Sequence, residues 1–181
     1  ELGDLAKLKL TLAYLGLESG SDKVLKFIVK GNTAADMIEG CAKVRAAGMG
    51  LSIIAMLGVG GMEHTSEHRV ETANIISQIA PEYFSFLTTV AVPGTPYYTL
   101  LEKGARLAPL TIHELLCEMR DTLQDIDPGD REILFRANHV SNQYPIGGVL
   151  RRDTPQIIDT LTEWISVCPE GVYPEPRLSS L

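Results

Sequence analysis

The sequence has few cysteines, no long run of like charge and no apolar stretch long enough to cross a membrane. Its three cysteines, Cys41, Cys117 and Cys168, have a spacing that fits no metal-binding motif, and their odd number fits no closed disulfide framework. We therefore expect a reducing, cytoplasmic setting. No basic stretch leads into a long apolar run near the N-terminus, so neither a signal peptide nor a membrane partner is predicted.

Charge and composition narrow the functional class. The chain has 181 residues, of which 45% are hydrophobic and 22% charged, so a buried core is expected and disorder is not. The net charge of −7 argues against non-specific binding of nucleic acid. The chain begins at Glu1, in what resembles the end of a helix, and we expect it to be a fragment of a longer protein.

Three apolar, strand-like runs, at residues 10–17, 51–57 and 83–92, each end in a glycine-bearing loop, and a helix-period segment follows each loop. The run at 10–17 is almost continuously apolar, which is typical of a strand buried on both faces. A strand–loop–helix series predicts a parallel α/β sheet with its ligand sites at the carboxyl ends of the strands. Three such units are too few to close a barrel, so the chain alone should form an open sheet.

Local signals predict where the helices begin. Ser21 is a candidate N-cap, and Thr33 and Thr111 are each followed by an acidic residue at capping-box spacing. The helix after the second run is predicted to begin at Thr65 or Ser66. Residues 130–151 should be irregular and polar, a last helix should begin near residue 153, and the tail from residue 170 should be extended or mobile.

The loop after the first run, Tyr14-Leu-Gly-Leu-Glu-Ser-Gly-Ser21, places Glu18 and Ser19 where a strand gives way to a turn. A carboxylate at such a place can accept hydrogen bonds from a vicinal diol such as a ribose. The alternative is that Glu18 caps the following helix. In the second loop, Gly58-Val-Gly-Gly61 either lets the backbone approach a ligand closely or forms only a tight turn.

Two further motifs have ordinary structural interpretations. Tyr97 and Tyr98, after the stiff turn Pro93-Gly-Thr-Pro96, could stack on a base, but core packing is favoured. Glu63-His64-Thr-Ser-Glu-His68 separates two histidines by four residues, a spacing that can bind zinc. The HExxH order is absent, so a solvated helix start is favoured and no metal site is predicted.

The stretch from Phe135 to Tyr144 is the densest polar segment. It contains the candidate substrate-side residues Arg136, Asn138, His139 and Asn142. Such a loop either lines a pocket or satisfies backbone groups within a long connection, and the sequence favours neither. No serine or cysteine in it has an evident base partner, so nucleophilic catalysis is not predicted.

Taken together, Gly16-Leu-Glu-Ser-Gly-Ser21, Leu57-Gly-Val-Gly-Gly61 and Val92-Pro-Gly-Thr-Pro96, in this order and spacing, resemble the C-terminal half of the radical S-adenosylmethionine (radical SAM) core. The likeness covers residues 8 to 104. The stretch 135–142 also resembles a segment downstream of the core in one poorly characterised branch of that superfamily.

The resemblance implies a partial (β/α)6 TIM-like barrel of parallel strands, with residues 1–104 supplying its last three strands and residues 105–181 forming a helical extension. It implies an oxidoreductase in which a 4Fe–4S cluster binds S-adenosylmethionine and cleaves it reductively to a 5′-deoxyadenosyl radical, which abstracts a substrate hydrogen. The implied cofactor contacts, for the ribose or methionine portion and for the adenine, are Glu18, Ser19, Met56, Leu57, Gly58, Val90 and Val92.

The chain departs from the family pattern in two ways. The three-cysteine loop that holds the cluster and the glycine-rich loop that receives the SAM amino group are both absent, and both would lie upstream of Glu1. In addition, the usual Gly-Leu-Pro-Gly-Glu-Thr turn here reads Gly58-Val-Gly-Gly-Met-Glu63. Because an iron–sulfur cluster needs thiolate ligands, we expect this chain alone to hold no cofactor, to be inactive and to need the missing N-terminal half as its partner.

Two other classes stay open. One is a non-catalytic α/β interaction module that pairs, or dimerises, through an open sheet edge. The other is an ordinary nucleotide-binding fold, which is disfavoured because Gly58-Val-Gly-Gly61 lacks the G-x-G-x-x-G spacing. The substrate cannot be predicted from these residues.

Overall fold

A five-stranded sheet organises the chain in the computed structural model, which describes residues 1–102 and 107–175. The sheet order is β1-β2-β3-β4-β5, and its first four strands are parallel while β5 is antiparallel to β4. The strands are β1 (Leu12–Glu18), β2 (Gly50–Leu57), β3 (Tyr83–Thr88), β4 (Leu134–Ala137) and β5 (Ile146–Val149). The predicted open α/β sheet is thus present. The expected boundary between residues 104 and 105 and the last tail residues, 176–181, lie outside the described residues.

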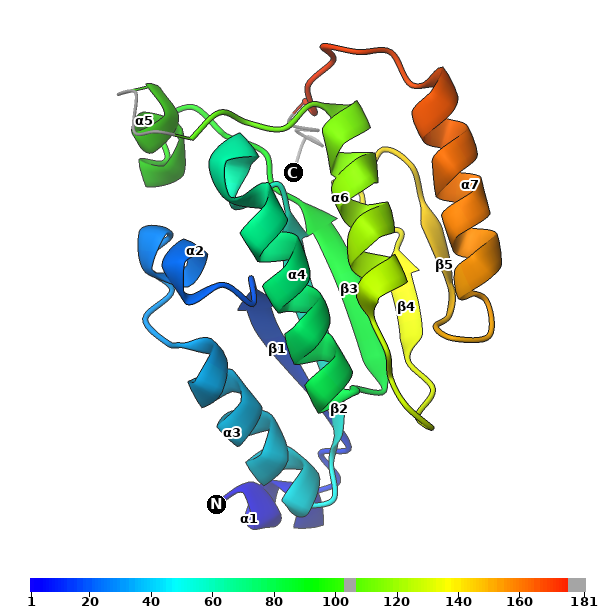
Figure 1. Ribbon diagram of the computed structural model, residues 1–181. Helices are drawn as coiled ribbons and strands as arrows, with labels where there is room; N and C mark the ends of the chain where they lie inside the picture. Colours follow the sequence, from blue (N-terminus) through cyan, green and yellow to red (C-terminus); the bar gives the residue numbers. More distant parts are fainter. Residues whose placement is uncertain (103–106, 176–181) are drawn as a thin grey trace.

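Helices cover one face of this sheet. Figure 1 shows α3, α4, α6 and α7 side by side in front of the strands, with α2 and α5 near the carboxyl ends of β1 to β3. No helix in the described part of the chain is long and apolar enough to cross a membrane. The helices are α1 (Leu2–Lys7), α2 (Asp22–Phe27), α3 (Ala34–Ala46), α4 (Gly61–Ile79), α5 (Pro96–Glu102), α6 (Ile112–Asp125) and α7 (Thr154–Val167).

The core lies between the sheet and this helix layer. Alternate strand residues point to opposite faces, so Leu51, Ile53, Ala55 and Leu57 of β2 are buried against the helices while Met56 is only partly covered. Phe84, Phe86 and Phe135 bring their ring centroids within 4.8 to 6.0 Å of one another. Two-sided burial of the first strand was a wrong prediction, because Tyr14 is 70% exposed on the uncovered face.

The capping predictions are confirmed at three helices and wrong at one. Ser21 accepts a hydrogen bond from the Val24 amide, and both capping boxes, at Thr33 and at Thr111, are complete. Helix α4 begins at Gly61, four residues before the predicted Thr65. A glycine turn, in which the Gly61 amide donates to the Gly58 carbonyl, starts this helix, and the Thr65 hydroxyl is used elsewhere.

Residues 130–151 are not irregular, because they contain β4 and β5. Each of these strands has only four residues, so the buried Phe135 and Ala137 alternate with too few neighbours to form a visible pattern. Strand β3 ends at Thr88, earlier than the predicted residue 92. Strand β1 is one edge of the sheet, and pairing or dimerisation through that edge stays a prediction.

Candidate functional site

The carboxyl ends of β1, β2 and β3 meet beside a cavity of about 650 Å³, which we call the rim pocket. Among the residues predicted to contact a cofactor, Glu18, Met56 and Val90 line this pocket. Val59, Thr89 and Tyr97, with residues 27–29 at the end of α2, complete most of its wall. The structure therefore brings one residue from each of the three predicted loops to a single largely apolar cavity.

Backbone geometry directs Glu18 into the pocket. The register between β1 and β2 shifts between Gly16 and Glu18, and Glu18 has a φ of 61°, in the left-handed region that non-glycine residues seldom adopt. A Cβ atom at Gly16 would lie 2.3 Å from Glu18 Oε1, so the absence of a side chain there makes room for the carboxylate. Glu18 does not cap α2, which is the task of Ser21.

A cation lies beside this carboxylate. Lys30 Nζ donates to Glu18 Oε1 at 2.7 Å, and both side chains are about three-quarters buried, with 27% and 23% of their side-chain surface exposed. An adjacent carboxylate and ammonium can receive a hydroxyl-bearing and an anionic group of the same ligand. Lys30 was not predicted, because it lies 12 residues from Glu18 and no local pattern connects them.

The rest of the pocket is mainly apolar, and its other polar side chains are the hydroxyl-bearing Thr89, Thr95 and Tyr97. The Tyr97 hydroxyl lies 3.5 Å from the Val59 carbonyl, to which it donates, and burial raises the pKa of Tyr97 to about 12, so the phenol stays protonated and neutral. Thr89 Oγ1 is buried and has no hydrogen-bond partner in the part of the chain that the structure describes. Val29, a β-branched residue, has a φ of 56°, and strained backbone of this kind concentrates at functional sites. Tyr97 thus lines a pocket, not the core.

The other predicted cofactor residues do not line this pocket. Ser19 and Leu57 are buried on the helix side, and the Gly58 amide donates to Glu118 Oε1 at 2.6 Å. Val92 is 37% exposed, in the loop after β3. The Gly58 amide is thereby engaged, which favours the tight-turn interpretation of the glycine cluster over the anion-binding one.

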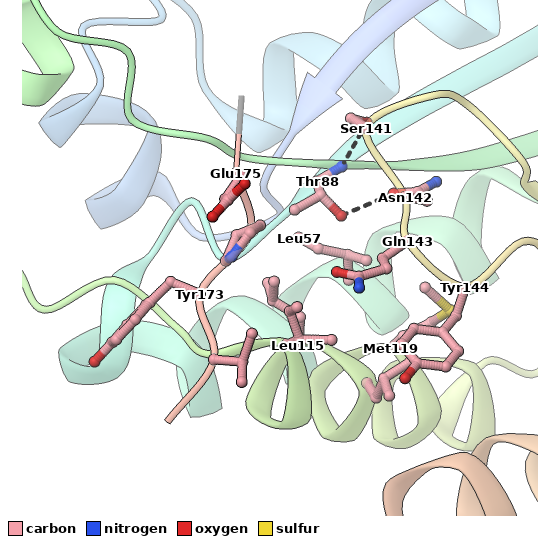
Figure 2. A pocket seen from close by; sticks show the side chains of 14 residues that line it. Leu57, Thr88, Leu115, Met119, Ser141, Asn142, Gln143, Tyr144, Tyr173 and Glu175 are labelled. Carbon is pink, nitrogen blue, oxygen red and sulfur yellow. Dashed lines mark hydrogen bonds between the residues drawn. The ribbon is translucent and has the colours of Figure 1, made fainter. Parts of the chain in front are cut away.

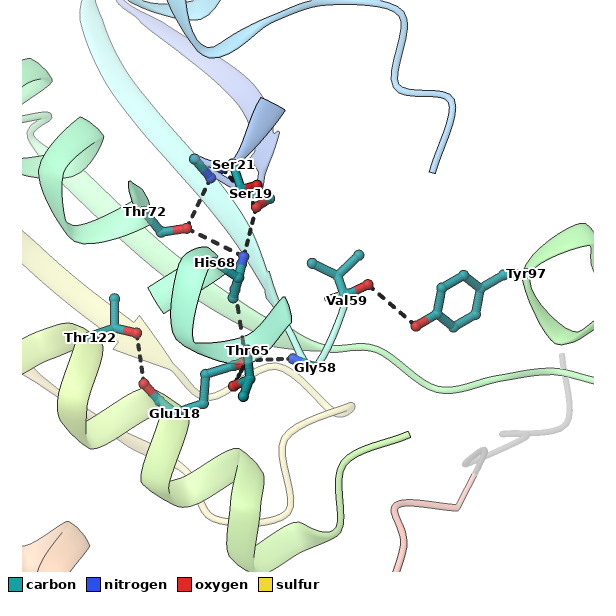
Figure 3. Close-up of polar contacts among 11 residues, drawn as sticks. Ser19, Ser21, Gly58, Val59, Thr65, His68, Thr72, Tyr97, Glu118 and Thr122 are labelled. Atoms are coloured by element: carbon teal, nitrogen blue, oxygen red, sulfur yellow. Dashed lines mark hydrogen bonds and ion pairs between the residues drawn. The ribbon is translucent and has the colours of Figure 1, made fainter. Parts of the chain in front are cut away.

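Behind the pocket lies a buried polar cluster, drawn in Figure 3. His68 Nε2 lies 3.7 Å from Glu118 Oε1, and both side chains are fully buried. Burial raises the pKa of Glu118 to about 7, against hydrogen bonds from Thr65 and Gly58 that lower it, and burial lowers the pKa of His68 to about 4. The prediction that the His64 and His68 segment is a solvated helix start is wrong for His68, because α4 turns this residue onto the core.

The polar segment after β4 is hydrogen-bonded to the end of β3. Asn142 Nδ2 donates to the Phe86 carbonyl at 2.7 Å, Asn142 Oδ1 accepts from Thr88 Oγ1 at 2.8 Å, and Ser141 Oγ accepts from the Thr88 amide at 3.1 Å. These contacts pin the loop to the end of β3. Asn142 therefore fits the alternative in which side chains of this segment satisfy backbone groups.

A second cavity, of about 340 Å³, lies beside this loop on the helix side of the sheet. Figure 2 shows it between Gln143 and Tyr144 of the loop, Leu115 and Met119 of α6, and Glu175 near the end of the described tail. Of the predicted substrate-side residues, only Asn142 borders this cavity. Arg136 and Asn138 border a shallower hollow along β4 and β5, and His139 is exposed.

The described residues contain no group of three His, Cys, Asp or Glu side chains that could hold a metal ion. Cys41 is buried on α3, Cys117 lies on α6 and Cys168 follows α7, all as free thiols. The three cysteines thus belong to three different elements, and the absence of a metal site stays a prediction.

Comparison with curated proteins finds sequence relatives that share one name. It is 34% identical over 104 residues to a tRNA-2-methylthio-N(6)-dimethylallyladenosine synthase of Methylococcus capsulatus, covering 54% of this chain and 22% of that protein. It is 34% identical over 88 residues to the protein of the same name in Alkalilimnicola ehrlichii, covering 48% and 19%. The chain thus spans about a fifth of the length of these curated relatives. No family model matches the sequence.

A solved structure shares the fold. The archaeal Methanocaldococcus infernus Elp3 with an N-terminal deletion superposes with a TM-score of 0.66, at 15% identity, over 91% of this chain and 38% of that one. The likeness extends beyond the three βα units, since 91% of the chain includes most of the segment after residue 104. At this level of identity it concerns the fold alone.

Proposed function

The chain is related to the radical SAM superfamily, as its sequence relatives indicate over about half of its length, and from this premise we propose that the rim pocket receives the adenosyl part of S-adenosylmethionine. The chain then contributes the C-terminal side of the site in a larger iron–sulfur oxidoreductase. The whole protein's activity is part of the proposal, because the chain spans only a fifth of the relatives' length.

One observation carries the proposal: the Glu18 carboxylate, which is paired with the Lys30 ammonium, borders an otherwise mainly apolar cavity. An adenosyl group has the matching chemistry, with a flat apolar base at one end and a ribose diol at the other. Met56, Val59 and Val90 would pack against the base, since apolar walls bury most of a ligand's surface in such sites. The cavity of about 650 Å³ lies within the usual range for small-molecule pockets.

The polar groups would then orient the ligand. The Glu18 carboxylate can accept from both ribose hydroxyls, and the Lys30 ammonium can donate to the methionine carboxylate. The Thr89 hydroxyl, which has no hydrogen-bond partner among the described residues, can donate to a ring nitrogen. When bound to a cluster and reduced, S-adenosylmethionine supplies a 5′-deoxyadenosyl radical for hydrogen abstraction. This chain's residues bind and orient the cofactor, and the apolar wall excludes water.

The chain does not fit the cluster itself. A 4Fe–4S cluster requires neighbouring thiolates, whereas its three cysteines lie on different elements. We expect the chain alone to be catalytically inert and to obtain its cluster ligands from a segment outside it. Anaerobic reconstitution with iron and sulfide tests this. A cluster-like absorption band with cleavage of S-adenosylmethionine would contradict it.

The names of the curated relatives include tRNA, whereas the proposal for this chain concerns S-adenosylmethionine alone. The chain's net charge of −7 provides no electrostatic reason for nucleic-acid binding.

Titration of the isotope-labelled chain with 5′-deoxyadenosine, followed by NMR, tests the pocket. Binding should be weak, because only one side of the site is present, and the shifted amides should cluster at Glu18, Met56 and Val90. Glu18→Gln removes the charge and should weaken binding about tenfold or more. Glu39→Gln, at an exposed i,i+4 pair on α3, is the matched control and should bind like the parent chain. Shifts confined to other surfaces, or equal affinities for the two variants, would contradict the proposal.

A further inference from the structure

Helix α4 holds the loop after β1 through hydrogen bonds. The Ser21 amide donates to Ser19 Oγ at 3.0 Å, and Ser19 Oγ lies 2.8 Å from His68 Nδ1. The Gly20 amide donates to Thr72 Oγ1 at 2.9 Å. All of these groups are buried, so each hydrogen bond is made in a low-dielectric interior. A polar group left without a hydrogen bond there lowers the free energy of unfolding.

The loop after β2 is held by α6 through the same cluster. Glu118 Oε1 accepts from the Gly58 amide at 2.6 Å, and Glu118 Oε2 accepts from Thr65 Oγ1 at 2.5 Å. Above its raised pKa of about 7 Glu118 is ionised, and charge-assisted hydrogen bonds are about twice as strong as neutral ones. Glu118 reaches Gly58 from 60 residues further along the chain, so the contact ties α6 to the end of β2.

His68 lies between the two loops. Its Nδ1 faces Ser19 Oγ, and its Nε2, for which the described residues offer no hydrogen-bond partner, faces Glu118 Oε1 at 3.7 Å. The neutral imidazole has one donor and one acceptor nitrogen. With the Ser19 hydroxyl donating to Nδ1, the proton is on Nε2 and points toward the Glu118 carboxylate. A polar path then runs from the Ser21 amide to the Gly58 amide, through hydrogen bonds except at the 3.7 Å step between His68 Nε2 and Glu118 Oε1 (Figure 3).

We propose that Ser19, His68 and Glu118 are positioning residues that couple the two loops bordering the rim pocket. Ser19 directly follows Glu18, and Gly58 follows the β2 end that carries Met56. None of the three touches the pocket, yet a shift at one loop changes the hydrogen bonding that fixes the other. The ligand's identity rests on the proposed function, but the coupling does not.

The competing view is that each polar group merely satisfies its neighbour, without transmission between loops. A pair of serine variants separates the two views. Ser19→Ala breaks the path at its β1 end, whereas Ser21→Ala removes an equally buried hydroxyl in the same loop, one that caps α2 and bonds Glu67 instead. The readout is hydrogen exchange of the Gly58 amide, which neither serine contacts.

Ser19→Ala should speed Gly58 exchange about two- to fivefold, which corresponds to a change of 10–30% in a charge-assisted bond. Ser21→Ala should leave Gly58 unchanged and speed exchange only around α2. In the reverse direction, Glu118→Gln should speed Gly58 exchange about tenfold and also speed exchange of the Ser21 amide.

Equal Gly58 exchange in the parent chain and in Ser19→Ala would overturn the coupling, as would a Glu118→Gln effect confined to Gly58 and its neighbours. Binding of 5′-deoxyadenosine is measured separately in the same variants. Absence of binding by the parent chain counts against the adenosyl assignment only, while the exchange pattern still decides whether the loops are coupled.

Discussion

The buried pair His68 and Glu118 predicts an unusual pH profile for the stability of this protein. Burial raises the pKa of Glu118 to about 7 from a usual 4.5 and lowers that of His68 to about 4 from a usual 6.5. The folded pair therefore holds one proton between about pH 4 and pH 7. The unfolded pair also holds one proton between 4.5 and 6.5. Because stability changes with pH only where the two states bind different numbers of protons, the pair contributes almost no slope in that window.

Replacing either residue should make the free energy of unfolding depend on pH, because the titration of the remaining residue is no longer compensated. In His68→Phe, unfolded Glu118 loses its proton near pH 4.5 while folded Glu118 keeps it until about 7, so the free energy of unfolding falls as the pH rises between these values. In Glu118→Gln, unfolded His68 gains a proton near pH 6.5 while folded His68 stays neutral down to about 4, so the free energy of unfolding falls as the pH drops. At 1.36 kcal/mol per pKa unit, each change is about 3 kcal/mol.

Urea unfolding followed by circular dichroism at pH 4 to 8 measures these slopes. The parent curve is subtracted from each variant curve, which removes the contribution of every other ionisable group. Ser77→Ala is the control, because Ser77 also lies on α4 with its hydroxyl hydrogen-bonded but has no group that titrates. Difference curves of opposite slope are expected. Flat difference curves for both variants would refute the argument that burial shifts these two groups.

Further predictions concern packing, and each is measured as the free energy of unfolding in urea. Gly20→Ala should lower the free energy of unfolding by about 1–3 kcal/mol, because the new Cβ would lie 2.3 Å from the backbone of Glu71. Gly40→Ala should raise it by about 0.5–1 kcal/mol, because Gly40 lies in the middle of α3 and its new Cβ would meet no described atom within 4 Å. Similar effects at both glycines would contradict close packing of the β1 loop on α4. Thr111→Ala should cost about 1 kcal/mol by removing the α6 capping box, and an unchanged value would remove that role. Phe135→Ala should cost about 3–5 kcal/mol through a cavity in the aromatic cluster, and a loss below about 1 kcal/mol would show that the cluster collapses around it.

Local chemistry explains which parts of the fold could be predicted from the sequence. The boxes at Thr33 and Thr111 involve residues three apart, so the sequence alone displays both partners. Strands β4 and β5 were missed because each has only four residues, and because β4 pairs with β3, about 50 positions away, while β5 pairs with β4. The start of α4 was missed because a glycine turn, which leaves no side-chain signal, replaced the hydroxyl cap.

The same distinction between local and distant contacts explains which residues of the candidate site could be predicted from the sequence. A motif of consecutive residues suggests that all of them touch a ligand, but successive strand residues face opposite sides of a sheet. Met56 therefore faces the rim pocket while Leu57 faces α6, and Glu18 faces the pocket while Ser19 faces α4. The partners of the inward half, His68 and Glu118, lie 49 positions from Ser19 and 60 from Gly58, where no spacing rule could find them. We therefore expect the inward-facing half of the candidate motif to hold the loops, so that substitution there changes amide exchange in the loops before it changes any contact with the proposed ligand.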